Sequence, residues 1–342
     1  MNDKEFDLIT LGRSSLDLYS QNIGADFVDI KGFDAFVGGS PLNIAVGASR
    51  LGATASLLTG VGNDKVGDFI INFLKLQNVG TDTIARIEGA RSSAVVLGIE
   101  PPDRFPLVYY RDNAADSQVT IDDVIAAKIE RYRILEISAT ALNIEPSRSA
   151  VFYAVETAAD HHTGILLDMD FRADQWKDLR SFGLMVRAIL PKVTIAIGTE
   201  EEVLAATLHD AGQVHIRHQQ ISAPEVTGDL GAAVQKIIHA GPEMLILKRG
   251  AKGVTVYFRD GRVLEVPGFP VTVLNVLGAG DAFASGFIYG YLQRWDIFRA
   301  CRLGNASGAW VVQQSGCANA MPYLDELMQF IQSKGGLVPQ SA

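Results

Sequence analysis

The stretch NVLGAGDAF, from Asn275 to Phe283, places two glycines and an acid at the joint between two kinds of sequence. Before it, the run Val271–Val276 is apolar and strand-like. After it, Asp281–Arg294 has the length and the apolar spacing of a helix. A strand, a glycine turn and a helix in this order are typical of α/β proteins, so this stretch gives the first indication of the fold.

The glycine turn itself, Gly278-Ala279-Gly280, lies at the expected amino-terminal end of that helix. Three successive backbone N–H groups there would have no intrahelical acceptor, and the helix dipole would add positive potential. Such a turn forms an anion hole for a phosphoryl group, and Asp281 beside it could deprotonate an attacking hydroxyl. Taken alone, the stretch is explained equally well by a plain helix start with an acid in its first turn.

Two other nucleotide-binding motifs are absent from the sequence. No Gly-Lys dipeptide occurs anywhere in the chain, which excludes the P-loop pattern. Phe283 stands where a dinucleotide-binding GxGxxG would need its third glycine. The sequence therefore supports neither of these two standard phosphate-binding motifs.

A second unusual stretch is GGSPLNIAVGASRLG, from Gly38 to Gly52. Its double glycine, Gly38-Gly39, would let the backbone approach a ligand closely. One turn into the following helix, Asn43 could donate and accept hydrogen bonds, as hydroxyl recognition requires. Without other support, a tight turn followed by a helix start explains this stretch better.

The bulk composition indicates an ordinary globular protein with a large core. The chain has 342 residues, of which 48% are hydrophobic and 20% are charged, and its net charge is −9 with a pI near 5.2. Such an acidic chain argues against nucleic acid as a partner, and no apolar run approaches the roughly 18 residues that cross a membrane. The two cysteines, Cys301 and Cys317, are interpreted as packing residues. With no visible signal peptide, a cytoplasmic protein is expected.

Short β-rich runs alternate with helical segments along most of the chain, which predicts a mostly parallel sheet covered by helices. The expected strands are Phe6–Leu11, Ala55–Gly60, Ile134–Ile137, Ile165–Asp168, Thr194–Ile197 and Met244–Lys248. The expected helices are Pro41–Leu51, Gly67–Gln77, Ser147–His161, Glu200–Leu208 and Leu230–Ala240. Val254–Phe258 and Val263–Val266 predict a hairpin near one edge of the sheet.

Two separate insertions predict a smaller β element. Residues Ala25–Val37 alternate polar and apolar, as a strand pair would, and Ser93–Tyr110 is a second β block with a turn at Pro101-Pro102-Asp103. We therefore expect a core of residues 1–12, 39–91 and 117–334, a β lid of residues 13–38 and 92–116, and a loose tail of residues 335–342. Such a lid could cover a site.

Together, GGSPLNIAVGASRLG and GAGDAFASGF resemble the two signature segments of the ribokinase-like (PfkB-type) carbohydrate kinases. The resemblance covers nearly the whole chain and implies a three-layer α/β/α domain with a mostly parallel central sheet and a small β-sheet lid. It also implies ATP and Mg²⁺ as cofactors, Asp281 as the catalytic base, and an anion hole formed by Gly278, Ala279 and Gly280. Lid sheets in this family often pair, so the resemblance also allows a homodimer.

Two further positions bear on metal ions. The segment GTEEEV, Gly198 to Val203, is similar to the family's Asn-x-x-Glu motif with Thr199 in place of Asn, and it implies that Glu202 helps to hold hydrated Mg²⁺. A solvated acidic first turn of a helix explains this segment equally well. Asn275 stands where the family usually has an acid associated with a monovalent cation, so the resemblance leaves that cation open.

Nucleotide contacts are implied at two places. The loop LKRGAKG, Leu247 to Gly253, closes an expected strand with glycines and lysines, and the family uses this loop around the nucleotide. The resemblance thus implies Lys248, Gly250 and Gly253 as nucleotide-binding residues, with Asn305 near the adenine.

A narrower resemblance indicates a linear keto-deoxy sugar acid as substrate. The segments LGRSSLDLY, PPDRFPLVYYRDNAAD, LDMDFRADQW and GCANAMP are similar to those of family members that phosphorylate 5-dehydro-2-deoxy-D-gluconate in myo-inositol breakdown. A bidentate arginine suits the carboxylate of such an acid, and an aspartate accepts from hydroxyls. The implied substrate-binding residues are Arg13, Asp17, Gly38, Gly39, Asn43, Arg111, Asp170 and Arg172. A surface ion pair is the better explanation of any one arginine taken singly.

We therefore expect ATP-dependent phosphorylation of the terminal 6-hydroxyl of this sugar acid, and three alternatives stay open. The first is the isomer 2-dehydro-3-deoxygluconate, because the sequence does not place the partners of each hydroxyl. The second is a nucleoside, which the arginines fit less well than they fit a carboxylate. The third is a non-catalytic sensor of sugar acids, which would have no need for a base at Asp281.

Overall fold

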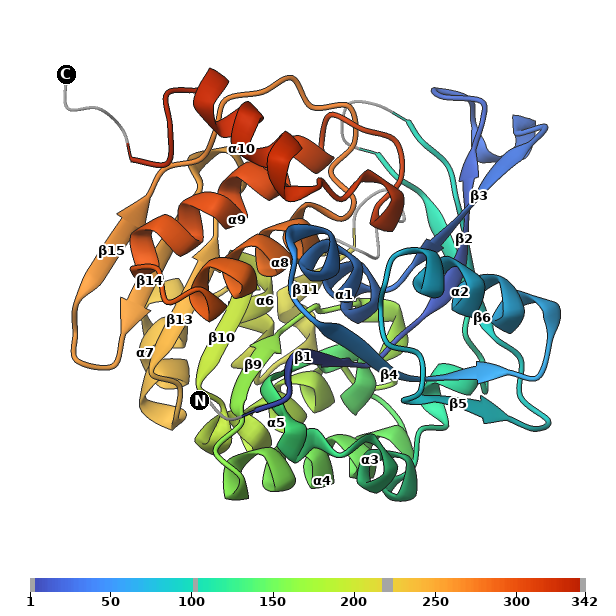
Figure 1. Cartoon of the computed structure of the whole chain (residues 1–342), viewed down its shortest axis with the longest axis horizontal. Helices are drawn as coiled ribbons and strands as arrows, with labels where there is room; N and C mark the ends of the chain where they lie inside the picture. The colour runs from blue at the N-terminus through green and yellow to red at the C-terminus, as the bar shows by residue number, and fades with distance from the viewer. Residues whose placement is uncertain (1–3, 101–103, 217–223, 339–342) are drawn as a thin grey trace.

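The computed structural model describes residues 4–100, 104–216 and 224–338, and it is built around one large sheet (Figure 1). The nine strands of this sheet have the order β15-β14-β13-β10-β9-β8-β1-β4-β5. Their bounds are β1 Phe6–Leu11, β4 Ala55–Gly62, β5 Ile84–Ile87, β8 Tyr132–Ser138, β9 Gly164–Asp168, β10 Ile195–Thr199, β13 Met244–Lys248, β14 Val254–Phe258 and β15 Val263–Val266. All neighbouring pairs are parallel except the two that involve β14, so the predicted edge hairpin is confirmed.

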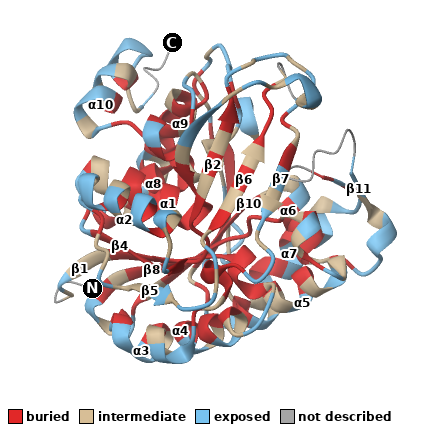
Figure 2. Ribbon diagram, turned by 90° about the vertical axis from the view of Figure 1, so that its right-hand side faces the viewer, coloured by how far each residue is buried: buried red, intermediate tan, exposed pale blue. Residues whose placement is uncertain are grey.

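Helices cover both faces of the large sheet, as its continuous apolar strands require. One face is covered by α1 Ser40–Leu51, α2 Lys65–Leu76, α8 Ala279–Leu292 and α9 Ile297–Val311. The other face is covered by α3 Ile121–Ala127, α4 Ser147–Asp160, α5 Leu179–Ile189, α6 Glu200–Ala206 and α7 Leu230–Ala240. The last helix, α10 Leu324–Ser333, packs outside α9. Figure 2 shows the buried residues concentrated in the strands and on the inward sides of these helices, which confirms the predicted three layers.

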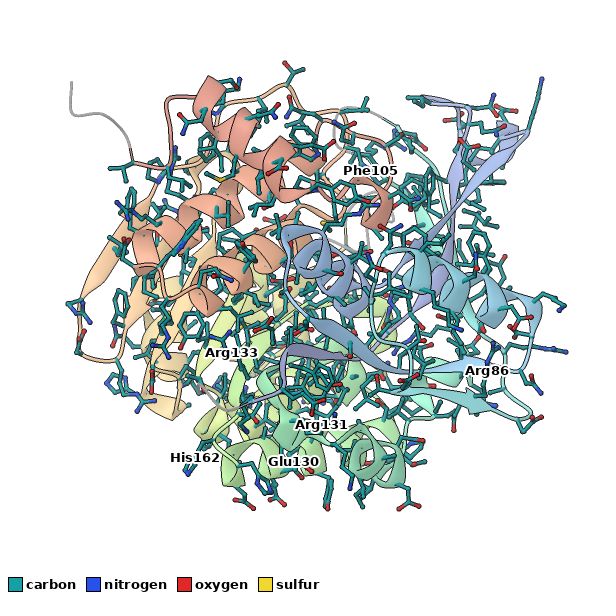
Figure 3. The ribbon with its side chains drawn as sticks, viewed as in Figure 1. Arg86, Phe105, Glu130, Arg131, Arg133 and His162 are labelled. Carbon is teal, nitrogen blue, oxygen red and sulfur yellow. The ribbon has the colours of Figure 1, made fainter. Side chains whose placement is uncertain are left out.

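A second, smaller sheet stands beside the first, where β2 and β3 rise away from the core in Figure 1. Its strand order is β3-β2-β6-β7, with bounds β2 Ser15–Ser20, β3 Phe33–Gly38, β6 Ser93–Leu97 and β7 Leu107–Tyr110. We call it the small sheet. Its strands all lie within the two expected insertions, and its own apolar cluster includes Phe105, labelled in Figure 3. A two-stranded ladder, β11 Val214–His215 with β12 Glu225–Val226, lies elsewhere.

Two expectations about secondary structure are wrong. Residues Val271–Val276 form no strand, because the sheet ends at β15 and no neighbour pairs with them. Instead the N–H groups of Leu274 and Asn275 both donate to the carbonyl of Val312. The strand pair expected within Ala25–Val37 contributes one strand only, since β3 pairs with β2 from the preceding segment.

The remaining differences lie at loops and at the end of the chain. The expected turn at Pro101-Pro102-Asp103 lies outside the described residues, as does the end of the expected tail. The first tail residues are held in place, because Arg302 donates from Nε to the carbonyl oxygen of Leu337 at 3.1 Å. Helices α3 and α5 were not anticipated. Over the described ranges, no helix combines the length and the apolar character that a membrane crossing needs.

The carboxyl ends of parallel strands lie at the same edge of a sheet, and several predicted site residues lie at this edge. Arg13 follows β1, Asp170 and Arg172 follow β9, and Lys248 is the last residue of β13. The amino terminus of α8 approaches the same edge, with the Gly280 backbone beside the Lys248 side chain.

Candidate active site

The turn at the start of α8 has the backbone that its glycine predicts. Gly278 is the N-cap residue and has a φ of +78°, in the left-handed region that glycine adopts without strain. A Cβ at Gly278 would lie 2.9 Å from Cys317 Sγ, which is closer than real contacts allow. Both the dihedral angle and the close approach of Cys317 therefore require glycine here.

The expected set of three free N–H groups is found only in part. The N–H of Ala279 donates to the carbonyl of Val276 in a long contact of 3.4 Å. In the part of the chain that the structure describes, the N–H groups of Gly278 and Gly280 have no acceptor. The turn thus has two free donors and a third whose weak bond an anion could replace.

Asp281, in the first turn of α8, is held by α1. The side-chain amide of Asn43 donates from Nδ2 to Asp281 Oδ2 at 2.7 Å, which brings the two signature segments into direct contact. Burial raises the pKa of Asp281, and Asp170 adds to the rise, while the Asn43 amide and the nearby Ser40 hydroxyl oppose it. A carboxylate with a raised pKa is a stronger base than a free one, so its environment suits proton abstraction.

Lys248 lies beside this turn together with two buried carboxylates. A Cβ at Gly280 would lie 3.1 Å from Lys248 Nζ, so the ammonium approaches the α8 backbone. Lys248 Nζ pairs with Asp168 Oδ1 at 3.2 Å and Glu202 Oε2 at 3.7 Å. Burial raises the pKa of Asp168 to about 7, with Lys248 opposing and Glu202 adding to the rise. Burial favours the neutral amine of Lys248, but the two carboxylates outweigh it and raise the lysine pKa, so it stays charged.

Glu202 has a structural partner as well as a position near the expected metal. Its carboxylate accepts from the N–H of Thr199 at 2.7 Å and closes a capping box at the start of α6. Glu202 is 8% exposed, so a solvated turn does not describe this residue, although Glu201 beside it is exposed. Among the described residues, no three His, Cys, Asp or Glu side chains gather around one point where a metal could bind. Two buried carboxylates beside an anion-binding turn fit a hydrated Mg²⁺ carried by phosphates better than an ion caged by protein.

The other end of the site contains a buried chain of polar side chains after β1. Arg13 Nη1 donates to Ser15 Oγ at 2.7 Å, and Ser15 Oγ donates to Asp17 Oδ1 at 2.6 Å. A Cβ at Gly38 would lie on the Asp17 carboxylate, and one at Gly39 would lie 2.2 Å from the Arg13 carbonyl oxygen. The two glycines are needed because the Arg13–Asp17 segment packs directly against them.

Arg172 and Asp170 form an ion pair after β9. Arg172 Nη2 lies 2.6 Å from Asp170 Oδ1, and the Ser138 hydroxyl donates to Asp170 Oδ2 at 2.9 Å. Burial alone would raise the pKa of Asp170, but Arg172 and Arg13 outweigh it and hold the pKa below its usual range. This carboxylate is therefore a permanent anion that orients the arginine beside it.

Arg111 is anchored by two side chains, Asp116 and Gln175. Its Nε donates to Asp116 Oδ2 at 2.7 Å, and its Nη1 donates to Gln175 Oε1 at 2.6 Å. The side chain is 7% exposed. Its Nη2 is buried and finds no acceptor within the described residues, so it is the one nitrogen left for a ligand.

Three of the residues expected to bind the nucleotide are the loop glycines Gly250 and Gly253 and the amide residue Asn305. Gly250 and Gly253 have φ values of +56° and +88°, and a Cβ at Gly253 would lie 2.1 Å from the carbonyl oxygen of Val266. Asn305 Nδ2 donates to the carbonyl oxygens of Val266 at 3.1 Å and Pro267 at 2.9 Å. The donor group of Asn305 therefore holds the backbone at the end of β15, and its position near the adenine stays a prediction.

Several site residues were missed by the sequence reasoning. Ser15 links Arg13 to Asp17, and Gln175 anchors Arg111, but neither residue type stands out in a sequence. Glu136, in the middle of β8, is 0% exposed, and neither carboxylate oxygen has a partner among the described residues. Burial raises its pKa well above the usual value, with Asp168 and Asp281 adding to the rise. A glutamate inside an apolar strand, RILEIS, was the available signal.

Known proteins resemble this chain in sequence over most of its length. The sequence matches the pfkB family carbohydrate kinase description over residues 7–324. A 5-dehydro-2-deoxygluconokinase of Bacillus thuringiensis is 34% identical over 337 residues, which cover 98% of each chain. One of Clostridium tetani is 32% identical over 332 residues, covering 97% of this chain and 94% of that protein.

Solved structures share the fold. A fructokinase of Xylella fastidiosa with bound ATP superposes with a TM-score of 0.82 at 24% identity, covering 96% of this chain and 99% of that one. An E. coli protein described as a ribokinase II, in complex with ATP and Mg²⁺, has a TM-score of 0.84 at 22% identity with the same coverage. At these identities the likeness establishes the three-layer architecture.

Proposed function

The chain belongs to the PfkB family of carbohydrate kinases, transferases that use ATP and act on an alcohol group, and we propose that it phosphorylates the 6-hydroxyl of 5-dehydro-2-deoxy-D-gluconate. The observation that carries the proposal is the 2.7 Å hydrogen bond between Asn43 and Asp281 at the start of α8. It fixes a carboxylate beside an anion-binding turn, which is the arrangement that phosphoryl transfer to a hydroxyl needs. The curated relatives at 30–34% identity support the substrate.

In the proposed reaction, Asp281 takes the proton of the 6-hydroxyl while the hydroxyl oxygen bonds to the γ-phosphorus of ATP. The bond from that phosphorus to the β–γ bridging oxygen breaks, and ADP leaves. The N–H groups of Gly278 and Gly280 donate to the oxygens of the transferring group, whose charge they stabilise without reorganisation. The Lys248 ammonium, next to Gly280, adds a fixed positive charge at the same place. Bound Mg²⁺ would neutralise phosphate charge, with Glu202 and Asp168 positioned to hold its waters.

The sugar acid is proposed to lie between this turn and the small sheet. Asp17 and Asn43 would bind its hydroxyls, and the carboxylate would be bound by Arg13 and Arg172, with the free Nη2 of Arg111 as a third donor. The ion pair with Asp170 supports this assignment, because it presents the Arg172 guanidinium in a fixed orientation. The backbone at Gly38 and Gly39 supplies the close approach that a small ligand needs. The small sheet would act as a lid that expels water from the site.

The test is a steady-state assay of ADP formation with the two isomeric keto-deoxygluconates, each purified and offered at matched concentrations. The proposal predicts a higher kcat/KM for the 5-dehydro-2-deoxy isomer. A higher value for the 2-dehydro-3-deoxy isomer would overturn the substrate and leave the mechanism standing. Sugar-dependent binding without any ADP formation would instead support a sensor on a kinase fold.

A further inference from the structure

The small sheet reaches the anion-binding turn through two side chains that the mechanism above does not use. Tyr19, on β2, and Cys317, in the loop before the short helix Ala318–Ala320, lie 2.9 Å apart from hydroxyl to Sγ. Both residues are buried, at 3% and 6% exposed. Since they are 298 positions apart in the chain, this hydrogen bond joins two parts of the molecule that only the fold brings together.

Cys317 also packs directly against the glycine turn at the start of α8. A Cβ built on Gly278 would meet Cys317 Sγ at 2.9 Å, its Cβ at 3.0 Å and its Cα at 3.3 Å, so the whole cysteine faces the Gly278 backbone. Gly278 has no side chain that could anchor it, so the close packing of Cys317 against its backbone restrains the residue.

The contact is part of a larger apolar cluster that crosses from the small sheet to the turn. The cluster of Tyr19 contains Cys317 as a buried member, and Leu277, the residue before Gly278, packs against it. Phe36, on β3, lies edge-on to Tyr19 with ring centroids 5.0 Å apart. A Cβ at Gly316 would lie 3.3 Å from the Phe36 ring. Displacement of the small sheet would thus remove the packing on both sides of Gly278.

The chemistry of the pair suits a supporting role beside a phosphate. Burial raises the pKa of the Cys317 thiol and of the Tyr19 hydroxyl well above their usual values, so both stay neutral at physiological pH. A neutral thiol and phenol add no negative charge that would repel a phosphoryl group. The hydrogen bond between them fixes the cysteine without competing for the N–H groups of the turn.

We propose that Tyr19 and Cys317 are positioning residues, which hold the anion-binding turn in its productive conformation when the small sheet is docked. The inference rests on the proposed function in that the turn binds the transferring phosphoryl group. Neither side chain touches the reacting atoms. The pair acts through Gly278, and it makes the geometry of phosphoryl transfer depend on the position of the small sheet.

The test compares Tyr19→Phe, Cys317→Ala and the double variant with Cys317→Ser, which keeps a hydrogen-bonding group of similar size. Each single variant is expected to lower kcat by about tenfold, with the KM for the sugar acid changed less than about twofold. The double variant should lose no more than either single one, because both remove the same interaction. Cys317→Ser should recover most of the activity.

Two matched controls remove comparable groups away from the turn. Tyr132→Phe deletes a buried hydroxyl that donates to Ser56 Oγ at 3.1 Å, and Cys301→Ala deletes a fully buried thiol in α9. These controls should keep kcat within about twofold of the starting protein. Losses in the controls equal to those at Tyr19 and Cys317, or additive losses in the double variant, would overturn the inference.

A second measurement separates this inference from the choice of substrate. Amide hydrogen exchange over residues 277–281 should become faster in Tyr19→Phe and Cys317→Ala and stay unchanged in the two controls. Exchange needs no turnover, so it tests the positioning role even when the 5-dehydro-2-deoxy acid proves to be the wrong acceptor. Unchanged exchange in both variants would contradict the role whatever sugar the protein phosphorylates.

Discussion

The two ends of the proposed site use acids in opposite ways. At the α8 end, burial raises the pKa values of Asp281 and Asp168, and Asp281 is the carboxylate proposed to take the proton. At the sugar end, the buried Asp170 has its pKa held low by Arg172 and Arg13, so it is fixed as an anion. Asp168 and Asp170 are buried to a similar extent, so the number of cations nearby accounts for the opposite shifts of their pKa values. These opposite shifts suit the proposed roles, proton transfer at the α8 end and binding of a charged substrate at the sugar end.

The two ends also differ in the groups that would bind ligands, which are mainly backbone groups at one end and side chains at the other. The α8 end uses backbone N–H groups of a glycine turn and one carboxylate held by a short amide side chain. The sugar end uses long arginines, and each is held by a polar or acidic side chain: Arg13 by Ser15, Arg172 by Asp170, and Arg111 by Asp116 and Gln175. Substitutions at the first end should therefore change kcat, and those at the second should change KM.

The largest effect is expected from Asp281→Asn, which removes the base and keeps the hydrogen-bonding shape. We expect kcat to fall by about a thousandfold, because the hydroxyl proton loses its acceptor. Binding of ATP, measured by calorimetry, should stay within about threefold of the starting value, since the turn and Lys248 remain. Near-normal turnover in this variant would show that the α8 end is not a proton-transfer site.

Arg172→Met tests the sugar end with a side chain of similar length and no charge. Loss of a charge-assisted bond to the substrate carboxylate should raise the KM for the sugar acid about 10- to 100-fold, with a smaller change in kcat. The matched control is Arg131→Met, whose arginine (labelled in Figure 3) forms an exposed ion pair with Glu5 and precedes β8, at the end of the strand opposite to the site. A loss of kcat with an unchanged KM would show that Arg172 does not act mainly in binding the sugar acid.

Glu136→Gln tests whether the buried carboxyl group of Glu136 is protonated and neutral in the folded protein. The folded-state pKa of Glu136 is raised, so the wild-type protein loses stability as the pH rises above about 4.5, where the unfolded chain gives up this proton. The glutamine variant has no such titration. It should be more stable by about 1–3 kcal/mol at pH 8, and the gain should shrink toward pH 5.

Denaturant unfolding of both proteins at pH 5 and at pH 8 measures this difference. A gain that is the same at both pH values would show that the carboxyl group does not titrate differently in the folded protein. A loss of stability at pH 8 would show that Glu136 is ionised and paired, contrary to its environment.

The smallest effect on activity is expected from Asn305→Ala. Its amide holds the carbonyls of Val266 and Pro267, so the variant should lose about 1–2 kcal/mol of unfolding free energy. The KM for ATP should change less than about threefold. A tenfold rise in that KM with unchanged stability would support a direct role in binding adenine.

The sequence predicts the core elements well where a local pattern decides them. Strands β1 and β13 and helix α7 begin and end at the predicted residues, because apolar runs and helical spacing mark them directly. The segment Val271–Val276 has the same β-branched character but forms no strand, since a strand also needs a neighbour to pair with. Pairing is a property of the fold and leaves no trace in the segment itself.

The same contrast holds for the site. Gly278 and Asp281 could be found from one stretch, because a left-handed turn and a helix-start acid have a local signature. Ser15, Gln175 and Cys317 could not, because each acts through a partner far away in the sequence or through a common residue type. Asn43 was singled out for its amide, but its bond to Asp281 appears only in three dimensions.

We propose that this site transfers the γ-phosphoryl group of ATP to the 6-hydroxyl of a keto-deoxy sugar acid. The most direct measurement is a proton–phosphorus correlation spectrum of the product formed from 5-dehydro-2-deoxy-D-gluconate and ATP. We expect a phosphorus resonance coupled to the two protons on carbon 6, absent when the Asp281→Asn variant replaces the starting protein. A phosphorus coupled to any other proton, or release of inorganic phosphate alone, would contradict it.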